Sequence, residues 1–384
     1  MTFGHTRPET TITKNTEQKE TNEMKQNRLK LTALFLIALI AFLAIPTQQI
    51  RAADASSATT WRVLWSHYTG WEIWEYIRAQ GIMDRHAAKN NVKIKIELVN
   101  DYIESINQYT VGKDIAGCAM TQIDALNIPC AGGVDSTVLI AGDYSNGNDG
   151  VALKNGTTLA DIKGRKVFLG VGGVSHYLLV RGLESETKLR ERDVTLLNTT
   201  DTDITAAFAG GGPKAAVVTY NPMLLKVKQE PNTLQVYSST NIPEEIIDLM
   251  VVKTSAPDGV KKALTDSWYE AMKIMSGGDA KAEEMIAFMA AFAGGTLGEF
   301  KSQLKTTRMF YDPAEAAALV KSPKLKKTME HVRTFSFDHG LLGDGVKSKD
   351  AIGIEFPDGS VIGSKANVKL RFKSSYMEKV SRGK

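Results

Sequence analysis

The amino-acid sequence predicts an α/β fold with two lobes, each a mainly parallel sheet flanked by helices, and a ligand-binding cleft between them. From Trp61 onward, short apolar runs alternate with longer amphipathic ones, which is typical of repeated β-α units. The alternation stops at a turn-rich segment, residues 143–150, and then restarts. A late apolar run, residues 247–252, leads back toward the first unit and into a largely helical part. We therefore expect two α/β lobes joined by two crossovers.

The first lobe is expected to comprise residues 60–146 and 249–384. Its strands are predicted at 61–65, 92–99, 115–120 and 137–142, with helices at 71–80, 102–111 and from 123. Its C-terminal helices are predicted at 259–277, 281–291 and 313–320. The tail from Asp344 has turn residues and alternating apolar positions, so we expect a small β-hairpin there.

The second lobe is expected to comprise residues 147–248. Its strands are predicted at 166–169, 194–197 and 215–218, with helices from 175 and at 201–209, before the strand at 247–252 returns to the first lobe. In such a layout a ligand lies at the carboxyl ends of the strands and at helix N-termini, and the lobes close over it about a hinge.

Residues 1–53 have the order of parts found in a secretory signal peptide, preceded by a polar extension. Lys25, Arg28 and Lys30 precede an apolar run over 31–46, and small residues follow at 52–55. The run is shorter than the about 20 residues that span a bilayer, so we expect cleavage and export to the periplasm, with an uncleaved anchor as the alternative. No cysteine follows the run, which argues against a lipoprotein anchor.

The charge of the chain belongs mainly to this leader. Of 47 Lys/Arg and 43 Asp/Glu, seven and four lie in residues 1–53, which leaves 40 against 39. A nearly neutral chain without a basic stripe gives no electrostatic support for nucleic-acid binding. The two cysteines, Cys118 and Cys130, allow a disulfide in an oxidising compartment, but a buried free thiol fits Cys118 equally well. No Cys/His cluster has metal-ligand spacing, so we expect no metal and no cofactor.

Several short segments resemble one family. They are Trp65-Ser66-His67-Tyr68-Thr69-Gly70-Trp71-Glu72, Asp143-Tyr144-Ser145-Asn146-Gly147, Ile162-Lys163-Gly164-Arg165-Lys166-Val167 and Ser175-His176-Tyr177-Leu178-Leu179. From about Trp61 to its end, the chain resembles the substrate-binding proteins of nitrate/taurine-class ABC importers. The resemblance implies a type II-like periplasmic binding protein, a monomer that delivers a small molecule to a membrane permease. One departure is Tyr220-Asn221-Pro222, where many members carry Trp-Glu-Pro.

The C-terminal part resembles a narrower subgroup, the binding proteins associated with urea carboxylase. The resemblance is carried by residues 332–343 (VRTFSFDHGLLG), 353–359 (GIEFPDG) and 367–372 (NVKLRF). It implies that the cargo is guanidine or urea. Two alternatives stay open: the same receptor with an oxyanion such as nitrate or a sulfonate, and an enzyme of the pyrimidine-forming branch of this fold.

The loop after the first strand is the leading candidate for ligand contact. Ser66, Tyr68, Trp71 and Glu72 supply a hydroxyl, aromatic faces and a carboxylate, which suit a small planar cation or urea. Cation-π contacts can reach about 2 kcal/mol when desolvated, whereas an exposed ion pair gives under about 1 kcal/mol. Trp71 and Trp74 also have the i, i+3 spacing of a core stripe, and Glu72 could equally be a solvated charge at a helix start.

Further candidates follow the other strands. Each has a structural alternative: a helix-start acid for Asp124, an Asx-turn for Asp143 and a hinge hydrogen bond for Asp248. The start of the helix near residue 175 offers free N-H groups that suit an anion, so for a cation the acids must dominate. These candidates are Thr121, Asp124, Asp143, Val174, Ser175, Tyr220, Asn221 and Asp248.

The sequence gives no sign of catalysis. Gly170-Val171-Gly172-Gly173 lacks the full dinucleotide-binding spacing, and Gly210-Gly211-Gly212-Pro213-Lys214 lacks the Walker arrangement. Adjacent Ser-His pairs do not form a triad, and no nucleophile elbow occurs. His176 is expected to be a helix residue packed against its own lobe. We expect a binding protein and not an enzyme.

Overall fold

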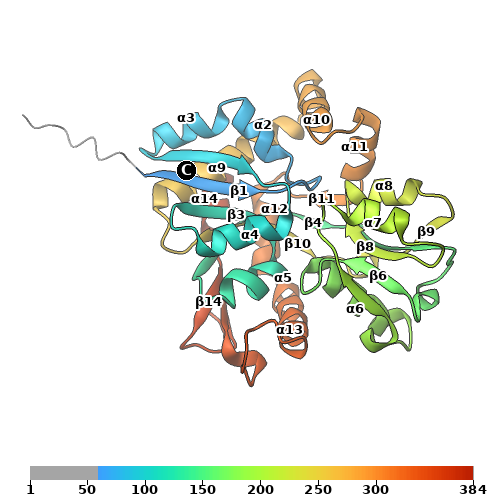
Figure 1. Ribbon diagram of the computed structural model, residues 1–384. Coiled ribbons are helices and arrows are strands. Elements are labelled where there is room, and N and C mark those ends of the chain that lie inside the picture. The colour runs from blue at the N-terminus through green and yellow to red at the C-terminus, as the bar shows by residue number, and fades with distance from the viewer. Residues whose placement is uncertain (1–58, 384) are drawn as a thin grey trace, which may run out of the picture. The chain divides into compact units, whose positions relative to one another are not determined.

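The computed structural model describes residues 59–383, and the predicted signal peptide at 1–53 lies outside them. The described residues belong to one compact unit that contains two sheets, one of nine strands and one of five. Figure 1 shows the elements of the five-stranded sheet (green to yellow) gathered to the right of the larger sheet. The predicted α/β architecture is confirmed; the exact lobe boundaries stay a prediction.

The larger sheet has the strand order β13-β12-β14-β4-β10-β3-β1-β2, and β11 pairs separately with β4. Its strands β1, β2 and β3 are parallel, while β10 is antiparallel to both β3 and β4. The carboxyl ends of β1 to β4 and the start of β10 therefore meet at one edge. The strands are β1 (Thr60–Trp65), β2 (Lys93–Leu98), β3 (Ile115–Thr121), β4 (Ser136–Ser145), β10 (Ile247–Lys253), β11 (Thr307–Met309), β12 (Gly353–Glu355), β13 (Val361–Ile362) and β14 (Val368–Phe372).

Helices cover this sheet, and several have sequence-encoded starts. Asp101 begins α4 by accepting the backbone N-H of Glu104, and Ser322 begins α13 by accepting that of Leu325, with Pro323 in its first turn. The helices are α2 (Ile73–Ala79), α3 (Ile82–Lys89), α4 (Tyr102–Val111), α5 (Gln122–Ala125), the π-helical η1 (Leu126–Cys130), α9 (Asp258–Met275), α10 (Ala280–Phe292), α11 (Leu297–Leu304), α12 (Pro313–Lys321), α13 (Pro323–Asp338), η5 (Lys349–Ala351) and α14 (Ser375–Ser381).

The smaller sheet has the order β7-β6-β8-β5-β9. Strands β6, β7 and β8 are parallel, and β5 runs antiparallel to β8 and β9. The carboxyl ends of β6, β7 and β8 and the start of β5 thus also share one edge. The elements are β5 (Asp149–Lys154), η2 (Leu159–Ile162), β6 (Lys166–Leu169), α6 (Val174–Glu186), η3 (Glu191–Asp193), β7 (Thr195–Asn198), α7 (Ile204–Gly210), β8 (Ala216–Tyr220), α8 (Met223–Gln229), β9 (Thr233–Ser238) and η4 (Ser239–Asn241).

Two crossovers join the sheets. The first runs from β4 to β5 and the second from η4 to β10. Ser145 and Ser239 tie them together through their hydroxyl groups at 2.7 Å, and the N-H of Ser145 donates to the carbonyl of Ile246. The prediction that β10 returns to the first sheet is confirmed. The predicted turn over 143–150 is wrong at both ends, because β4 extends through Ser145 and β5 begins at Asp149.

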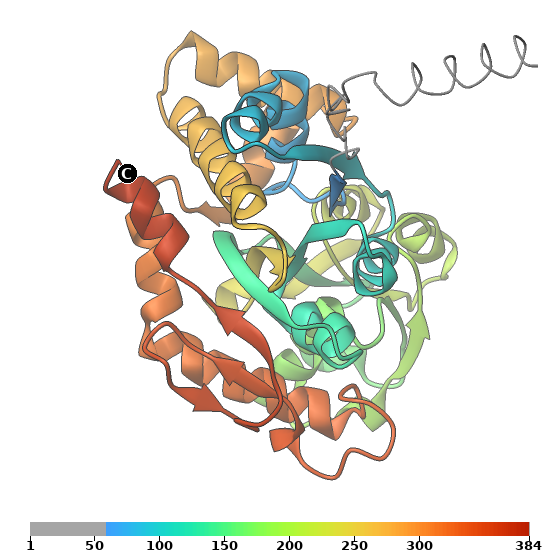
Figure 2. The same cartoon turned by 90° about the vertical axis from the view of Figure 1, so that its left-hand side faces the viewer.

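The C-terminal tail does more than form a hairpin. Strands β12 and β13 are antiparallel, as predicted, but β14 then pairs in parallel with β4 and joins the tail to the main sheet. Figure 2 shows the red C-terminal strands lying beside the green strand β4. Hairpin pattern alone could not predict this, since the partner of β14 lies more than 200 residues earlier.

The core resolves two choices that the sequence left open. Trp74 packs against Trp268 with ring centroids 4.9 Å apart, so it is a core residue. Cys118 and Cys130 are both buried free thiols, and burial raises the pKa of each to about 12. Among residues 59–383, the structure contains no helix with the length and apolar character needed to cross a bilayer.

Candidate ligand-binding site

The candidate site lies where the shared edges of the two sheets face each other. From the larger sheet, the loops after β1 and β2, the ends of β3 and β4 and the start of β10 contribute side chains. From the smaller sheet, the start of β5, the end of β8 and the beginning of α6 contribute. This is the place that the sequence predicted for a ligand in an α/β fold.

Four aromatic rings form a closed cage here. Tyr68 lies 4.9 Å from Trp71, which lies 5.5 Å from Tyr102, measured between ring centroids. Tyr220 closes the ring at 6.3 Å from Tyr102 and 6.1 Å from Tyr68. All four are at least 95% buried. Three rings come from the first-sheet side and one from the second, so the cage requires both sheets. Such a cage is the usual protein device for holding an organic cation.

Two buried carboxyl groups face each other beside the cage. Asp143 on β4 and Asp248 on β10 are paired in register. The hydroxyl of Tyr68 donates to Oδ1 of Asp143 at 2.9 Å, whereas Oδ2 of both aspartates has no partner among the described residues. Burial raises the pKa of both groups, and the charge of Asp143 raises the pKa of Asp248 further.

Asp124 is a third buried acid on this side. Its Oδ2 accepts the hydroxyls of Tyr102 at 2.7 Å and Thr121 at 2.8 Å, while Oδ1 has no partner among the described residues. Burial raises its pKa to about 6. Tyr102 also accepts the backbone N-H of Thr121, which fixes the ring against the end of β3. The carboxylate and the cage are therefore positioned by the same hydrogen bonds.

The second sheet adds two more acids. Asp149 pairs in register with Tyr220 across β5 and β8, is buried, and has a pKa that burial raises to about 7. The hydroxyl of Tyr220 donates to Oδ2 of Asp201 at 2.6 Å. Burial raises the pKa of Asp201 to about 6. Acidic groups thus approach the cage from both sheets.

The four rings, together with Asp149, Asp248 and other side chains, line a small cavity of about 10 Å³, and a wider groove of about 190 Å³ lies next to it. Tyr102, Val174 and Tyr220 line both spaces. Asp101, Glu104 and Asp201 line the groove, and no Lys, Arg or His lines either space. The electrostatic character of the site among the described residues is therefore acidic.

Most of the predicted residues come together here. The residues that line the cavity or hydrogen-bond to its walls are Tyr68, Trp71, Thr121, Asp124, Asp143, Val174, Tyr220 and Asp248. Ser175 lines the groove instead. Ser66 is buried in the same loop, and its hydroxyl has no partner among the described residues.

The last two predicted residues, Glu72 and Asn221, have their partners outside the cavity. Glu72 is buried and does not line the cavity: its Oε1 lies 2.7 Å from Nδ1 of His67, and its Oε2 has no partner among the described residues. Asn221 donates from its side chain to the hydroxyl of Thr306 at 3.3 Å and from its backbone to Asn148. It ties the second sheet to the segment before β11.

The sequence pattern does not identify Tyr102, Asp149 and Asp201 as site residues. It predicts Tyr102 only as the start of a helix, although Tyr102 follows the carboxyl end of β2, where a parallel sheet exposes ligand contacts. It predicts a turn at Asp149, because the short strand β5 follows a Gly/Asn-rich stretch. Asp201 follows β7 in the same way that Tyr102 follows β2.

The N-terminus of α6, considered above for an anion, faces an acid. A Cβ atom added to Gly173 would lie 2.9 Å from Oδ1 of Asp124, so the carboxylate already occupies the space before this helix. A negative charge is favourable at this end of a helix, and here the chain supplies it.

Comparison with known proteins shows the fold. No protein-family model and no curated protein matches the chain. The alkanesulfonate-binding protein SsuA from Xanthomonas axonopodis pv. citri is 15% identical with a TM-score of 0.60, over 74% of this chain and 95% of that one. The aliphatic sulphonate binding protein SsuA from Escherichia coli is 18% identical with a TM-score of 0.56, over 73% of this chain and 87% of that one. The nitrate-binding protein NrtA from Synechocystis PCC 6803 is 10% identical with a TM-score of 0.53, over 84% of this chain and 98% of that one. The chain shares the fold of these periplasmic binding proteins.

Proposed function

We propose that this protein is the periplasmic solute-binding component of an ABC importer and that it captures a small planar nitrogen cation, with guanidinium as the leading cargo. The observation that carries the proposal is the cage of Tyr68, Trp71, Tyr102 and Tyr220 beside buried carboxylate oxygens that have no partner among the described residues. The proposal also includes export by the predicted signal peptide, a monomeric receptor and delivery of the cargo to a membrane permease.

The cage and the acids recognise two different properties of such a cargo. The aromatic faces attract positive charge, by about 2 kcal/mol or more in a desolvated site. The free oxygens of Asp124, Asp143 and Asp248 require hydrogen-bond donors, because an unpaired buried carboxylate is costly. A guanidinium ion is planar, carries N-H donors on every side and has a delocalised charge. It therefore satisfies both requirements at once.

The buried acids also distinguish guanidinium from two other possible cargoes, a quaternary ammonium ion and urea. A quaternary ammonium ion offers the rings a positive charge but has no N-H donors for the carboxylate oxygens. Urea would donate to the oxygens but leave the charges of Asp143 and Asp248 uncompensated. Urea therefore stays a weaker cargo of the same receptor.

An oxyanion is disfavoured by the same groups. Nitrate or a sulfonate would enter a space lined by acids and no base, and the start of α6 faces Asp124. The sulfonate and nitrate proteins above share the fold with this chain at 10–18% identity. Fold alone does not fix a ligand.

The arrangement supports binding and not bond breaking. The hydroxyl of Ser66 has no partner among the described residues, so the neighbouring His67, which pairs with Glu72, does not activate it. The acids accept hydrogen bonds from tyrosines that burial keeps protonated, since the pKa values of Tyr68 and Tyr102 are raised well above 10. We therefore propose that the two lobes enclose and bind the cargo without making or breaking a covalent bond.

Calorimetry with the purified protein tests the proposal. Guanidinium, urea, tetramethylammonium, nitrate and ethanesulfonate are titrated at pH 7.5. We expect guanidinium to bind at least about tenfold more tightly than either urea, which lacks the positive charge, or tetramethylammonium, which lacks the N-H donors. We expect no binding of the two anions. Binding of nitrate or ethanesulfonate without binding of guanidinium would overturn the proposal.

A further inference from the structure

The wide groove next to the cage offers space that a simple guanidinium ion does not use. Tyr102, Val174 and Tyr220 line both the groove and the small cavity, so a cargo with its head among the rings can extend directly into the groove. The groove has a volume of about 190 Å³. At the about 30 Å³ that one molecule occupies in liquid water, this is room for roughly six groups of that size. Guanidinium has a single carbon atom and no group to place there.

The groove carries negative charge that no basic group lining it compensates. Asp101 and Glu104 line it from the start of α4, and Asp201 lines it from the segment after β7. The hydrogen-bond partners of these carboxylates are neutral. Asp101 accepts the backbone N-H of Glu104 at 2.8 Å, and Glu104 accepts the side-chain amide of Gln108 at 3.0 Å. Asp201 accepts the hydroxyl of Tyr220 at 2.6 Å. The groove therefore favours a positive charge.

A free carboxylate oxygen lies at the boundary between the two spaces. Oδ1 of Asp124 is buried, has no partner among the described residues and lies 2.9 Å from the position of a Cβ atom added to Gly173. Gly173 lines the groove, and Tyr102, which donates to the other oxygen of Asp124, lines both spaces. Together with Asp143 and Asp248, these acids outnumber the single positive charge of guanidinium. A cargo with two positive charges compensates more of them.

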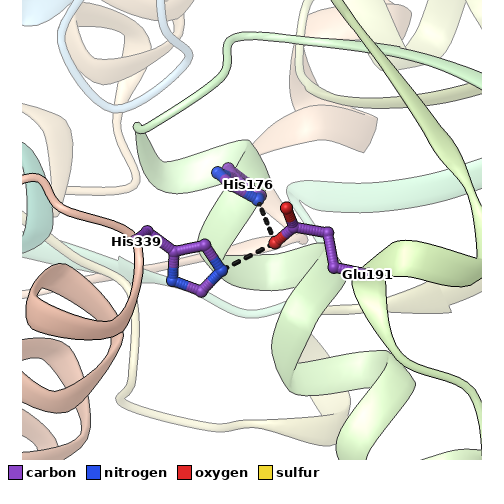
Figure 3. Close-up of side chains that lie close together, drawn as sticks. All are labelled: His176, Glu191 and His339. Atoms are coloured by element: carbon purple, nitrogen blue, oxygen red, sulfur yellow. Dashed lines mark hydrogen bonds and ion pairs between the residues drawn. The ribbon is translucent and has the colours of Figure 1, made fainter.

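The wall of the groove beside the smaller sheet is braced from the larger sheet. This wall includes the loop that starts α6. The side chain of Asn127, in η1, donates to the carbonyl of Gly172 in that loop at 3.0 Å. Figure 3 shows His176 of α6 and His339, which follows α13, both against Glu191 of η3, at 2.9 and 2.6 Å. A groove with a fixed wall binds a substituent at a smaller cost in ordering.

We infer that the cargo is a substituted guanidinium, with its head in the cage and an alkyl arm that runs along the groove to a second cationic group beside Glu104 and Asp201. The inference rests on the proposed function, because the cage must hold the head. It adds the substrate class, a dication with one guanidinium end. The arm replaces one N-H donor of the head and leaves the others for the buried acids.

The apolar walls of the groove suit such an arm. Ile103 of α4, Val171 and Val174 supply apolar surface that methylene groups can cover. Val171 is 44% exposed, which is unusual for a large apolar side chain in this protein. Full burial of one methylene group strengthens binding by about fourfold. The arm thus gains affinity from the apolar walls, and its terminal charge gains affinity from the acids.

Calorimetry with the purified protein at pH 7.5 tests the inference. The probes are guanidinium, pentylguanidine, (4-aminobutyl)guanidine and 4-guanidinobutanoate, and the last three have arms of equal length that end in a methyl, an ammonium and a carboxylate group. We expect pentylguanidine to bind more tightly than guanidinium. Relative to pentylguanidine, (4-aminobutyl)guanidine should bind at least about fivefold more tightly and 4-guanidinobutanoate at least about tenfold more weakly. The advantage of the ammonium group should shrink when salt is raised from about 0.05 M to about 0.5 M, because the acids of the groove are at least partly exposed.

The acids are tested through the ratio of two affinities, that of (4-aminobutyl)guanidine over that of pentylguanidine. A general loss of folding or closure affects both probes and cancels in this ratio. We expect the ratio to fall to about two or less in the double variant Glu104→Gln/Asp201→Asn, with Glu104→Gln alone in between. Glu315→Gln is the matched control and should keep the wild-type ratio. Glu315 is also an exposed glutamate in the first turn of a helix, but it lines neither space.

The outcomes separate this inference from the proposed function. If guanidinium binds but (4-aminobutyl)guanidine binds no more tightly than pentylguanidine, the inference is wrong and the proposed function stands. An unchanged ratio in the double variant also overturns the inference. If none of the probes binds, the proposed function fails and the inference fails with it.

Discussion

Asp143 and Asp248 stand opposite each other on the antiparallel strands β4 and β10, both buried, and each has a carboxylate oxygen without a partner among the described residues. Like charges placed opposite across a sheet destabilise it unless a proton or a cation compensates them. The empty protein is therefore less stable than its packing would allow, and a cation in the cage relieves this cost.

Replacing Asp143 by asparagine should weaken guanidinium binding and strengthen the empty fold. The amide keeps the shape but removes the charge, so we expect affinity to fall at least about tenfold, as for a lost charge-assisted hydrogen bond. We expect the free energy of unfolding to rise by about 1 kcal/mol. Calorimetry and denaturant unfolding measure the two effects, with Asp84→Asn, an exposed position on α3, as the control. A variant that keeps full affinity would show that the cargo does not contact this carboxylate.

Affinity for a cationic cargo should fall as pH falls. The pKa of Asp149 is raised to about 7 and that of Asp124 to about 6, and burial raises the pKa of Asp143 as well. Below these values protons compete with the cargo, so binding should release protons and weaken between pH 7.5 and 5.5.

The proton release is measured by calorimetry in two buffers that differ in ionisation enthalpy. Constant affinity over the whole pH range would contradict a site built from these acids.

Removing one wall of the cage should reduce affinity without unfolding the protein. Trp71→Leu deletes a ring that contacts both Tyr68 and Tyr102, and we expect an affinity loss of roughly tenfold or more. Trp74→Phe is the comparison, because Trp74 packs against Trp268 in the core. It should lower the free energy of unfolding and leave affinity within about twofold. The reverse pattern would place Trp71 in the core and Trp74 at the ligand.

Gly70 should tolerate no side chain. A Cβ atom there would lie 2.4 Å from Oδ2 of Asp143 and 2.8 Å from the ring of Tyr68. Gly70→Ala should displace both groups and reduce affinity at least tenfold, together with about 1–3 kcal/mol of stability. Gly298→Ala meets nothing within 4 Å and lies inside α11, so it should be neutral or stabilise by up to about 1 kcal/mol. Equal melting temperatures and affinities for the two variants would refute the close packing around Asp143.

The sequence by itself determined the class of fold and the region of the candidate site. The alternation of apolar runs predicted β1, α4, β3, β6 and β10 within a few residues, because a buried strand and an amphipathic helix leave different periods in the chain. It missed α3, α8, α11 and β9, which are short, and also the 16-residue helix α13. Residues that follow strands, such as Trp71 and Asp124, were identifiable because carboxyl ends of parallel strands converge.

Only the tertiary structure decided which of these residues meet. Asp143 faces Asp248 because β4 and β10 are neighbours, although 105 positions separate them in the chain. Glu72 is engaged by His67, and Tyr220 reaches Tyr102 only because the second sheet lies against the first. Glu191 and His339, 148 residues apart, meet for the same reason. Within each segment, the spacing of apolar residues indicates whether it forms a helix or a strand and which face is buried. Contacts between distant segments depend on strand order and on the fit of two lobes, which no local pattern encodes.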